Sequence, residues 1–265
     1  MNTIKLSLRN AARVVTPSLL ATYIRTKWDR EPEIDLLPAL CDPARISFDV
    51  GANWGQYAEA LSYVSAGVVA CEPVPQLAEY LRRTARKGIR VEQIALSNVK
   101  GDAEFAVPQD WGRSSLLAEK ADSDTQRLAV RLDTLDSMAT DPVGFIKVDV
   151  EGHEEEVIDG AFQVIARDHP VLLIEIEERH RPGALPRILA RLSEEGYSAF
   201  FLHEGSVHSI ATFDQEKHQN PAEVEDDPSG KVIRGCYINN FLFIHKNDLA
   251  EREKQLTKLG YKVIN

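Results

Sequence analysis

The chain has 265 residues, of which 43% are hydrophobic and 27% are charged, so it is long enough to bury the core of one large soluble domain. Its net charge of −10 disfavours general binding to nucleic acid, because counterion release rewards a basic surface. It has no run of about 20 apolar residues that would span a membrane, and its first residues do not resemble a secretory signal. Three cysteines without a CxxC pair fit a reducing compartment. We therefore expect a cytoplasmic protein that does not bind nucleic acid.

Residues 1–44 are expected to form an N-terminal helical extension. The first 30 residues carry six basic side chains against one acidic side chain, Asp29. Two interpretations of this basic segment stay open. It is either a helix that packs on its own domain or on a second subunit of a homodimer, or an amphipathic helix that contacts an anionic membrane or an acidic partner.

Residues 45–248 alternate short apolar runs with longer helical patterns, which is typical of βαβ units and a parallel sheet. Seven strands are predicted, at 45–50, 67–73, 89–96, 144–152, 170–178, 197–203 and 236–245. Apolar residues at helical spacing predict helices at 55–64, 75–87, 154–166 and 185–197. The polar segment 205–235 is predicted to be a loop or a lid over a site, and 249–265 a C-terminal tail or helix.

The first strand runs into the glycine-spaced turn "FDVGANWGQ". Asp49 ends the strand, Gly51 permits a tight turn, and the next helix starts near Gly55, so a ligand is expected at the carboxyl edge of the sheet. No GxxxxGK pattern is present, which excludes a P-loop. Asn53 replaces the second glycine of a dinucleotide fingerprint, so the turn favours a nucleoside ligand without a pyrophosphate.

Glu72 closes the second strand, and Pro73 turns the chain directly after it. An acidic residue in this position accepts hydrogen bonds from both ribose hydroxyls in nucleoside sites, whether the ligand is NAD or S-adenosylmethionine (SAM). After the third strand, Ala95 and Leu96 are expected beside the adenine ring.

The run "KVDVEGHEE" is the expected place for the chemistry. Side chains alternate along a strand, so Asp149 and Glu151 are expected to point together toward the ligand. Three alternatives stay open for the proton step: His153 as the base, Glu151 or Glu175 as the base, or positioning without a dedicated base. The same four side chains could instead surround Mg²⁺ or Ca²⁺, which the sequence does not decide. Residues 154–156, all glutamates, are expected to be a solvated helix entrance.

Three further places are expected to contact an acceptor molecule, and the polar segment 205–235 is one of them. In "DWGRSSLL", Trp111 can stack on a sugar face, Arg113 can bind an anionic group, and Ser114 can donate a hydrogen bond. His180 follows the fifth strand and is expected at the same edge of the sheet. Asn239 and Asn240 are polar residues in an otherwise apolar strand, and a buried amide needs partners, so one of them is expected to face the site.

Taken together, the motifs "FDVGANWGQYAEAL", "VVACEPVPQLAEYLRR", "FIKVDVEGHEEEVIDGA" and "NNFLFI" resemble the FkbM family of SAM-dependent methyltransferases, over about residues 46–245. The resemblance implies a class I methyltransferase (Rossmann-like) α/β fold, with a seven-stranded, mostly parallel sheet and helices on both faces. It implies SAM as the methyl donor and S-adenosylhomocysteine (SAH) as the product. It also implies that SAM is contacted by Asp49, Gly51, Asn53, Glu72, Ala95 and Leu96. We expect Asp149 to be a further SAM contact.

The leading hypothesis is a SAM-dependent O-methyltransferase that acts on a hydroxyl of a sugar, a glycan or another small natural product by in-line methyl transfer. Two alternatives remain. An NAD-linked oxidoreductase is weakened by Asn53 and by the lack of a Tyr-xxx-Lys pair. A non-catalytic scaffold that docks a partner through the basic N-terminal segment is weakened by the intact motifs.

Overall fold

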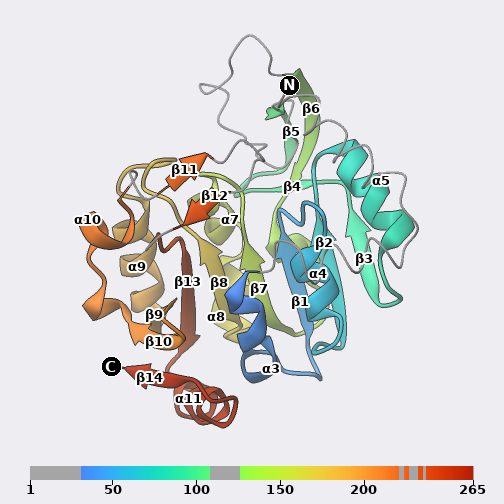
Figure 1. Ribbon diagram of the computed structural model, residues 1–265. Coiled ribbons are helices and arrows are strands. Elements are labelled where there is room, and N and C mark those ends of the chain that lie inside the picture. The colour runs from blue at the N-terminus through green and yellow to red at the C-terminus, as the bar shows by residue number, and fades with distance from the viewer. Residues whose placement is uncertain (1–30, 108–125, 221–223, 227–231, 235–236, 265) are drawn as a thin grey trace.

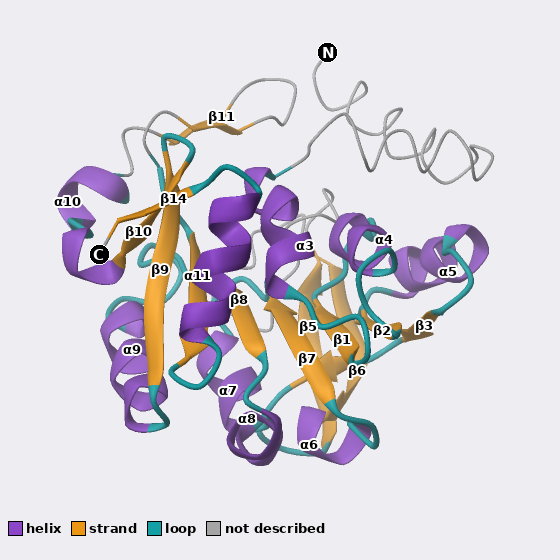
Figure 2. Ribbon diagram, turned by 90° about the horizontal axis from the view of Figure 1, so that it is seen from below, coloured by secondary structure: helices purple, strands orange, loops and turns teal. Residues whose placement is uncertain are grey.

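The computed structural model describes residues 31–107, 126–220, 224–226, 232–234 and 237–264. A central mixed sheet runs through the molecule, with helices on both faces (Figures 1 and 2). Its strand order is β14-β10-β9-β13-β8-β7-β1-β2-β3. None of the helices in the described part of the chain is long and apolar enough to cross a membrane.

All seven expected strands are present in this sheet. They are β1 (Ile46–Val50), β2 (Gly67–Cys71), β3 (Ile89–Glu92), β7 (Val143–Val148), β8 (Val171–Glu175), β9 (Tyr197–His203) and β13 (Asn240–His245). Five adjacent strands, in the order β8-β7-β1-β2-β3, are parallel to one another, whereas β13 is antiparallel to both β8 and β9. The order in which strands are added to the sheet reverses at β1, because β2 and β3 lie on one side of β1 and β7 and β8 lie on the other. This reversal point is where open α/β sheets bind ligands.

The sheet has nine strands in the structure rather than the seven expected. Strand β10 (Ser206–Ser209) pairs antiparallel with β9, and β14 (Lys262–Ile264) pairs parallel with β10. Glu204 and Gly205 both have positive φ, 47° and 72°. A two-residue turn of this kind matches the twist of a hairpin, so the polar segment after Gly205 starts as a strand.

The rest of the 205–235 segment contains short elements, and the last residues form a helix and a strand. The short elements are η4 (Ile210–Thr212), α10 (Gln215–His218) and a hairpin of β11 (Val224–Asp226) and β12 (Val232–Arg234). Helix α11 (Leu249–Lys258) precedes β14. It lies against the first described residues, because Arg252 donates hydrogen bonds to the carbonyl oxygens of Ala39 and Cys41.

Two apolar cores lie on opposite faces of the sheet. On one face, α7 (Glu154–Asp159), α8 (Phe162–Asp168) and α9 (Ala184–Glu194) pack against strand residues such as Phe48 and Ile146. On the other face lie η1 (Pro32–Leu36), α3 (Leu37–Leu40), α4 (Gln56–Leu61) and α11, with Leu81 of α5 (Pro75–Thr84) in the same core. The helix predicted over 154–166 is divided into α7 and α8 at Gly160, where a Cβ atom would lie 1.9 Å from the carbonyl oxygen of Ser97.

A second, three-stranded sheet was not predicted. Strand β5 (Gly101–Val107) pairs antiparallel with β6 (Gln126–Asp133), and β4 (Ala95–Leu96) pairs parallel with β6, before the short helix α6 (Leu135–Met138). Figure 1 shows β5 and β6 extending beyond the edge of the main sheet. Trp111, Arg113 and Ser114, between β5 and β6, lie outside the described residues, as does the basic segment 1–30.

Candidate functional site

The turn after β1 is held tightly between its two neighbouring strands. The backbone N–H groups of Gly51 and Ala52 both donate to the carbonyl oxygen of Cys71, each at 3.0 Å. Gly51 has φ of +80°, and a Cβ atom there would lie 1.8 Å from the carbonyl oxygen of Asp149. Only glycine therefore fits. Asn53 also has positive φ, 49°, and Gly55 with φ of 79° precedes α4.

Asp49 is buried beneath this turn. Its side chain is 2% exposed, and Oδ2 has no hydrogen-bond partner within the described ranges. Burial raises the pKa of Asp49 to about 7, although the positive charge of Lys147 acts in the opposite direction. A buried carboxylate oxygen without a donor is costly, so this atom is suited to a donor group supplied by a ligand.

Glu72 lies at the carboxyl end of β2, as the sequence predicted. Its Oε2 accepts a hydrogen bond from the N–H of Asn53 at 2.8 Å, and its Oε1 accepts one from the N–H of Val74 at 2.8 Å. Burial raises its pKa to about 7. Each carboxylate oxygen has two lone pairs, so both oxygens can still accept from ribose hydroxyls.

The side chains of the residues expected at the adenine ring are not exposed to a ligand. The side chains of Ala95 and Leu96 are buried in two different cores, Ala95 with Val74 and Phe105, and Leu96 with the core under α7 and α8. Ser97 follows them and is itself buried. A ligand would meet this segment mainly through its backbone.

A buried lysine that the sequence analysis did not single out lies at the centre of the site. Lys147 is 1% exposed, and its Nζ donates to Asn240 Oδ1 at 3.1 Å and lies 3.9 Å from Glu175 Oε2. Burial lowers the pKa of Lys147, but the negative charges of Asp149, Glu31, Glu175 and Asp49 outweigh this and raise it. The sequence did contain a signal for this residue, because Lys147 is a charged residue within an otherwise apolar predicted strand.

Glu31, the first described residue, also reaches this cluster. It accepts hydrogen bonds from the hydroxyl of Tyr57 at 2.9 Å and from Asn240 Nδ2 at 3.0 Å. The amide of Asn240 thus links Glu31 to Lys147. Burial also raises the pKa of Asp149.

His153, one of the residues expected as a base, has protein contacts at both nitrogens of its imidazole ring. Its Nε2 lies 3.0 Å from Ser97 Oγ, and its Nδ1 lies 3.4 Å from Glu156 Oε2. Burial lowers its pKa. Because both ring nitrogens are in contact with protein atoms, His153 is better suited to joining α7 to the segment after β4 than to taking a proton from an acceptor.

Glu151 and His180 are brought together. Glu151 has φ of +54°, an uncommon conformation for a residue with a side chain, and its Oε2 lies 3.0 Å from His180 Nδ1. Glu175, by contrast, accepts a hydrogen bond from Asn239, which also donates to Glu177. Glu177 is further bound by Arg179 and by the hydroxyl of Tyr237.

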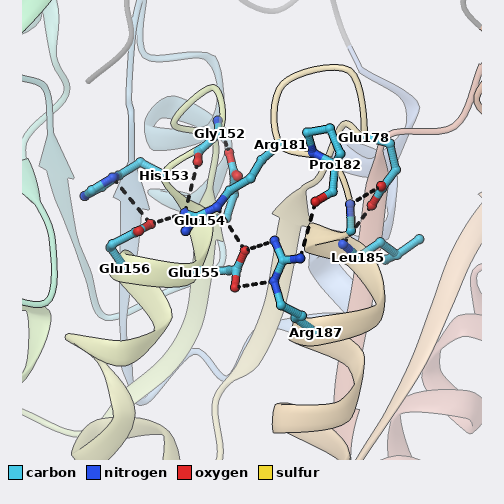
Figure 3. A network of polar contacts seen from close by, with 11 residues as sticks. Gly152, His153, Glu154, Glu155, Glu156, Glu178, Arg181, Pro182, Leu185 and Arg187 are labelled. Atoms are coloured by element: carbon cyan, nitrogen blue, oxygen red, sulfur yellow. Dashed lines mark hydrogen bonds and ion pairs between the residues drawn. The ribbon is translucent and has the colours of Figure 1, made fainter. Parts of the chain in front are cut away.

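The three glutamates at the start of α7 are not a solvated helix entrance as expected. Glu154 is 3% exposed and accepts from the N–H of Gly152 at 2.8 Å, and burial raises its pKa to about 7. Glu155 forms ion pairs with Arg181 and Arg187, and Glu156 pairs with Arg181 (Figure 3). The start of α7 lies against the loop after β8, which supplies Arg181, and against α9, which supplies Arg187.

The four residues considered for a metal do not form a ligand set. Across the described ranges, no three His, Cys, Asp or Glu side chains are grouped so that they could hold a metal ion. His153 lies against Ser97, whereas Glu151 lies against His180. Within the described residues, Asp149, Glu151, His153 and Glu175 are thus not gathered as one set of ligands.

The chain is similar to known methyltransferases. The model of the methyltransferase FkbM domain matches residues 49–199. No curated protein matches. The structure of the methyltransferase FkbM from Methylobacillus flagellatus KT is 18% identical with a TM-score of 0.47, and the match covers 76% of this chain and 44% of that one. An rRNA methylase from Streptococcus thermophilus is 12% identical with a TM-score of 0.45, over 82% of this chain and 97% of that one.

A third structure, a Streptococcus mutans protein assigned as a methyltransferase and complexed with SAH, is 10% identical with a TM-score of 0.42, over 81% of this chain and 97% of that one. The family match covers more than half of the chain and includes both the glycine turn and the segment from Lys147 to Glu156. The fold is the expected α/β methyltransferase fold, with nine strands in the main sheet. This chain belongs to the FkbM family of methyltransferases.

Proposed function

We propose that the chain is a SAM-dependent O-methyltransferase that methylates a hydroxyl of a sugar, a glycan or another small natural product and releases SAH. The observation that carries the proposal is the pairing of Asp49 and Glu72 at the carboxyl ends of two adjacent parallel strands. Between them, Asp49 Oδ2 and the second lone pairs of the Glu72 oxygens give a nucleoside ligand several acceptors.

The charge of the site supports SAM rather than a dinucleotide. Asp49, Asp149, Glu31 and Glu175 all act on the single cation of Lys147, so negative charge exceeds positive charge in this part of the site. Such a field favours a cationic ligand and disfavours a pyrophosphate. When bound, SAM supplies an electrophilic methyl group on a positively charged sulfur.

We assign the donor to the glycine turn. Asp49, Gly51, Asn53 and Glu72 would hold SAM, with the nucleoside end toward Glu72. The remaining acidic excess around Lys147 would stabilise the positive charge of the donor. The backbone after β4 would lie along the adenine ring.

Oxygen is proposed as the acceptor atom because of the polar groups at the next two strand ends. A hydroxyl must lose its proton as it is methylated, so it needs a nearby base. Glu151 and His180 follow β7 and β8, the strands beyond the reversal point. Trp111, Arg113 and Ser114 remain predicted acceptor contacts, and segment 205–235 remains a predicted loop or lid over the site.

Isothermal titration of the purified protein with SAM, SAH and NAD tests the donor. Micromolar binding of SAM and SAH without binding of NAD is expected, and repeating the titration with Mg²⁺ and with EDTA tests metal dependence. Binding of NAD alone would contradict the proposal. Silence from all three ligands would favour a non-catalytic scaffold. Hydroxylated glycosides can then be screened as acceptors by release of SAH.

A further inference from the structure

Glu31 contacts the helix that begins directly after the glycine turn. Its Oε2 accepts a hydrogen bond from the hydroxyl of Tyr57, the second residue of α4, at 2.9 Å. The same oxygen accepts a second hydrogen bond from Nδ2 of Asn240, the first residue of β13, at 3.0 Å. Tyr57 lies two positions after Gly55, so these contacts hold the carboxylate of Glu31 beside the turn to which we assign SAM.

The two groups that bind Glu31, a phenol and an amide, are both neutral. The amide of Asn240 lies between two charges, because its Nδ2 donates to Glu31 and its Oδ1 accepts from Nζ of Lys147 at 3.1 Å. Within the described residues, Glu31 forms no ion pair. The structure therefore places no cation of the described chain in direct contact with this carboxylate.

Three carboxyl groups from three separate segments meet at the glycine turn. The charges of Glu31, Asp49 and Asp149 act on one another. Asp49 is opposite Lys147 in the pairing of β1 with β7. A Cβ atom at Gly51 would lie 1.8 Å from the carbonyl oxygen of Asp149, so the backbone of Asp149 lies directly against the turn. The only cation that acts on all three carboxyl groups among the described residues is Lys147.

An unsatisfied atom among these groups points to a ligand. Asp49 Oδ2 has no hydrogen-bond partner within the described ranges, and the side chain is 2% exposed. A buried acceptor of this kind is costly unless a donor satisfies it. Lys147 is directed elsewhere, because its Nζ donates to Asn240 and to the carbonyl oxygen of Val148. A cationic group of a ligand would supply the missing positive charge.

The charge of Glu31 is compensated less than the charges of its neighbours. Among the carboxylates, Asp149 acts most strongly on Lys147, and Glu175 lies 3.9 Å from its ammonium nitrogen. Burial raises the pKa of Asp49 to about 7, so Asp49 is partly protonated at neutral pH. Glu31, which is bound by neutral donors, is therefore the carboxylate of this group that responds most to the charge of a ligand.

We propose that Glu31 is the residue by which the site distinguishes SAM from SAH. The inference rests on the proposed function, in which SAM is the donor. SAM carries a positive charge on sulfur, whereas SAH, which remains after the methyl group has left, has a neutral thioether at the same position. A carboxylate close to this sulfur stabilises the bound donor and gives no such stabilisation to the bound product. Glu31 thereby favours exchange of the product for a new donor.

Calorimetric titration of Glu31→Gln with SAM, SAH and sinefungin tests the assignment. The amide oxygen of glutamine can still accept from Tyr57 and Asn240, so the variant removes the charge and keeps both hydrogen bonds. Sinefungin carries an ammonium group in place of the sulfonium and has no methyl group to transfer. We expect SAM and sinefungin each to bind at least about fivefold more weakly than to the wild type, and SAH to change by less than about twofold.

Asp35→Asn is the matched control, because it removes one negative charge from an exposed position in the same segment. It should change the ratio of SAM affinity to SAH affinity by less than about twofold. Equal losses of SAM and SAH affinity in Glu31→Gln would overturn the inference, since Glu31 would then only shape the site. Unchanged SAM affinity, or an equal change of the ratio in Asp35→Asn, would also overturn it. A wild type that binds neither SAM nor SAH would overturn the proposed function itself.

Discussion

Lys147 and Asn240 are 93 positions apart in the sequence, and the ammonium nitrogen of one lies 3.1 Å from the amide oxygen of the other. The contact joins β7 to β13 across β8, at the edge of the sheet where the glycine turn lies. Through the same amide, Glu31 is connected to the cluster. A single buried cation therefore organises carboxylates from four separate parts of the chain.

Replacing Lys147 with methionine should destabilise the protein strongly. The substitution keeps the volume of the side chain but leaves Asp49, Asp149 and Glu175 without their cation. Removing one partner of a buried charged group costs about 3–5 kcal/mol. Urea unfolding at pH 8 measures the change. Lys254→Met is the matched control, because Lys254 is 64% exposed and should change stability by less than about 0.5 kcal/mol. Equal effects of both substitutions would contradict the role of Lys147.

Gly51→Ala should destabilise the protein more than the same substitution at Gly205, a glycine with a similar backbone conformation. Gly51 has φ of +80° with a backbone oxygen 1.8 Å from the added Cβ, whereas Gly205 has φ of +72° and nothing within 4 Å. The conformational penalty is shared, about 1–2 kcal/mol. We expect Gly205→Ala to lose that amount only, and Gly51→Ala to lose at least about 3 kcal/mol and all SAM binding, because the turn must move. Thermal unfolding and titration with SAM distinguish the two variants. Similar losses would show that close packing at Gly51 is unimportant.

The strand pattern and the glycine turn were predictable because they are local. Runs of β-branched residues and the spacing of Gly51 and Gly55 reflect backbone requirements that neighbouring residues impose. Strand β6 carried a similar signal that was missed. Its residues from Arg127 to Leu132 alternate toward solvent and core, with Val130 and Leu132 buried.

The side-chain partners in the site were not predictable from these patterns. Lys147 meets Glu31 and Asn240 only because the strand order brings β13 beside β8. His153 and Glu156 are three residues apart, but Ser97, which also contacts His153, comes from the segment after β4, 56 positions away in the sequence. The spacing of residues in the sequence predicts which side chains lie at the carboxyl edge of the sheet. The order of the strands, which the sequence pattern does not give, decides which of these side chains contact one another.

Glu72→Gln should weaken SAM binding while leaving the fold intact. A carboxylate accepts from Asn53 N–H, Val74 N–H and ribose hydroxyls together. The amide of glutamine would turn an NH₂ group toward one of these donors. We expect about a 100-fold loss of affinity, about 2.7 kcal/mol, in calorimetry.

Glu92→Gln is the control for this loss, because Glu92 ends the adjacent strand β3 and is paired with Arg90 at the surface. It should change SAM affinity less than threefold. If both variants bind SAM as the wild type does, the ribose contact assigned to Glu72 is wrong.

SAM affinity should rise from pH 6 to pH 8. Burial raises the pKa of Asp49 from 3.8 to about 7 and that of Glu72 from 4.5 to about 7, so both carboxyl groups ionise in this range. The groups that act on Asp49 are Lys147, Asp149 and Glu31, and those that act on Glu72 are Asp49 and Asp149. Because a cationic donor favours the ionised forms, affinity should increase about tenfold for each group that must be ionised. Titrations in buffers of different ionisation enthalpy should show protons released on binding.

The stability of the free protein should change in the opposite direction over a lower range. A carboxyl group with a raised pKa in the folded state stabilises the fold below its unfolded pKa, and this contribution is lost as pH rises through its folded pKa. For Asp49 and Glu72 the loss falls between about pH 4 and pH 7. Asp49→Asn removes one of these buried charges. It should therefore be more stable than the wild type at pH 8 in urea unfolding, bind SAM at least about tenfold more weakly, and show a smaller rise of affinity with pH. An affinity that is the same at pH 6 and pH 8 in the wild type would mean that neither carboxyl group meets the charge of the donor.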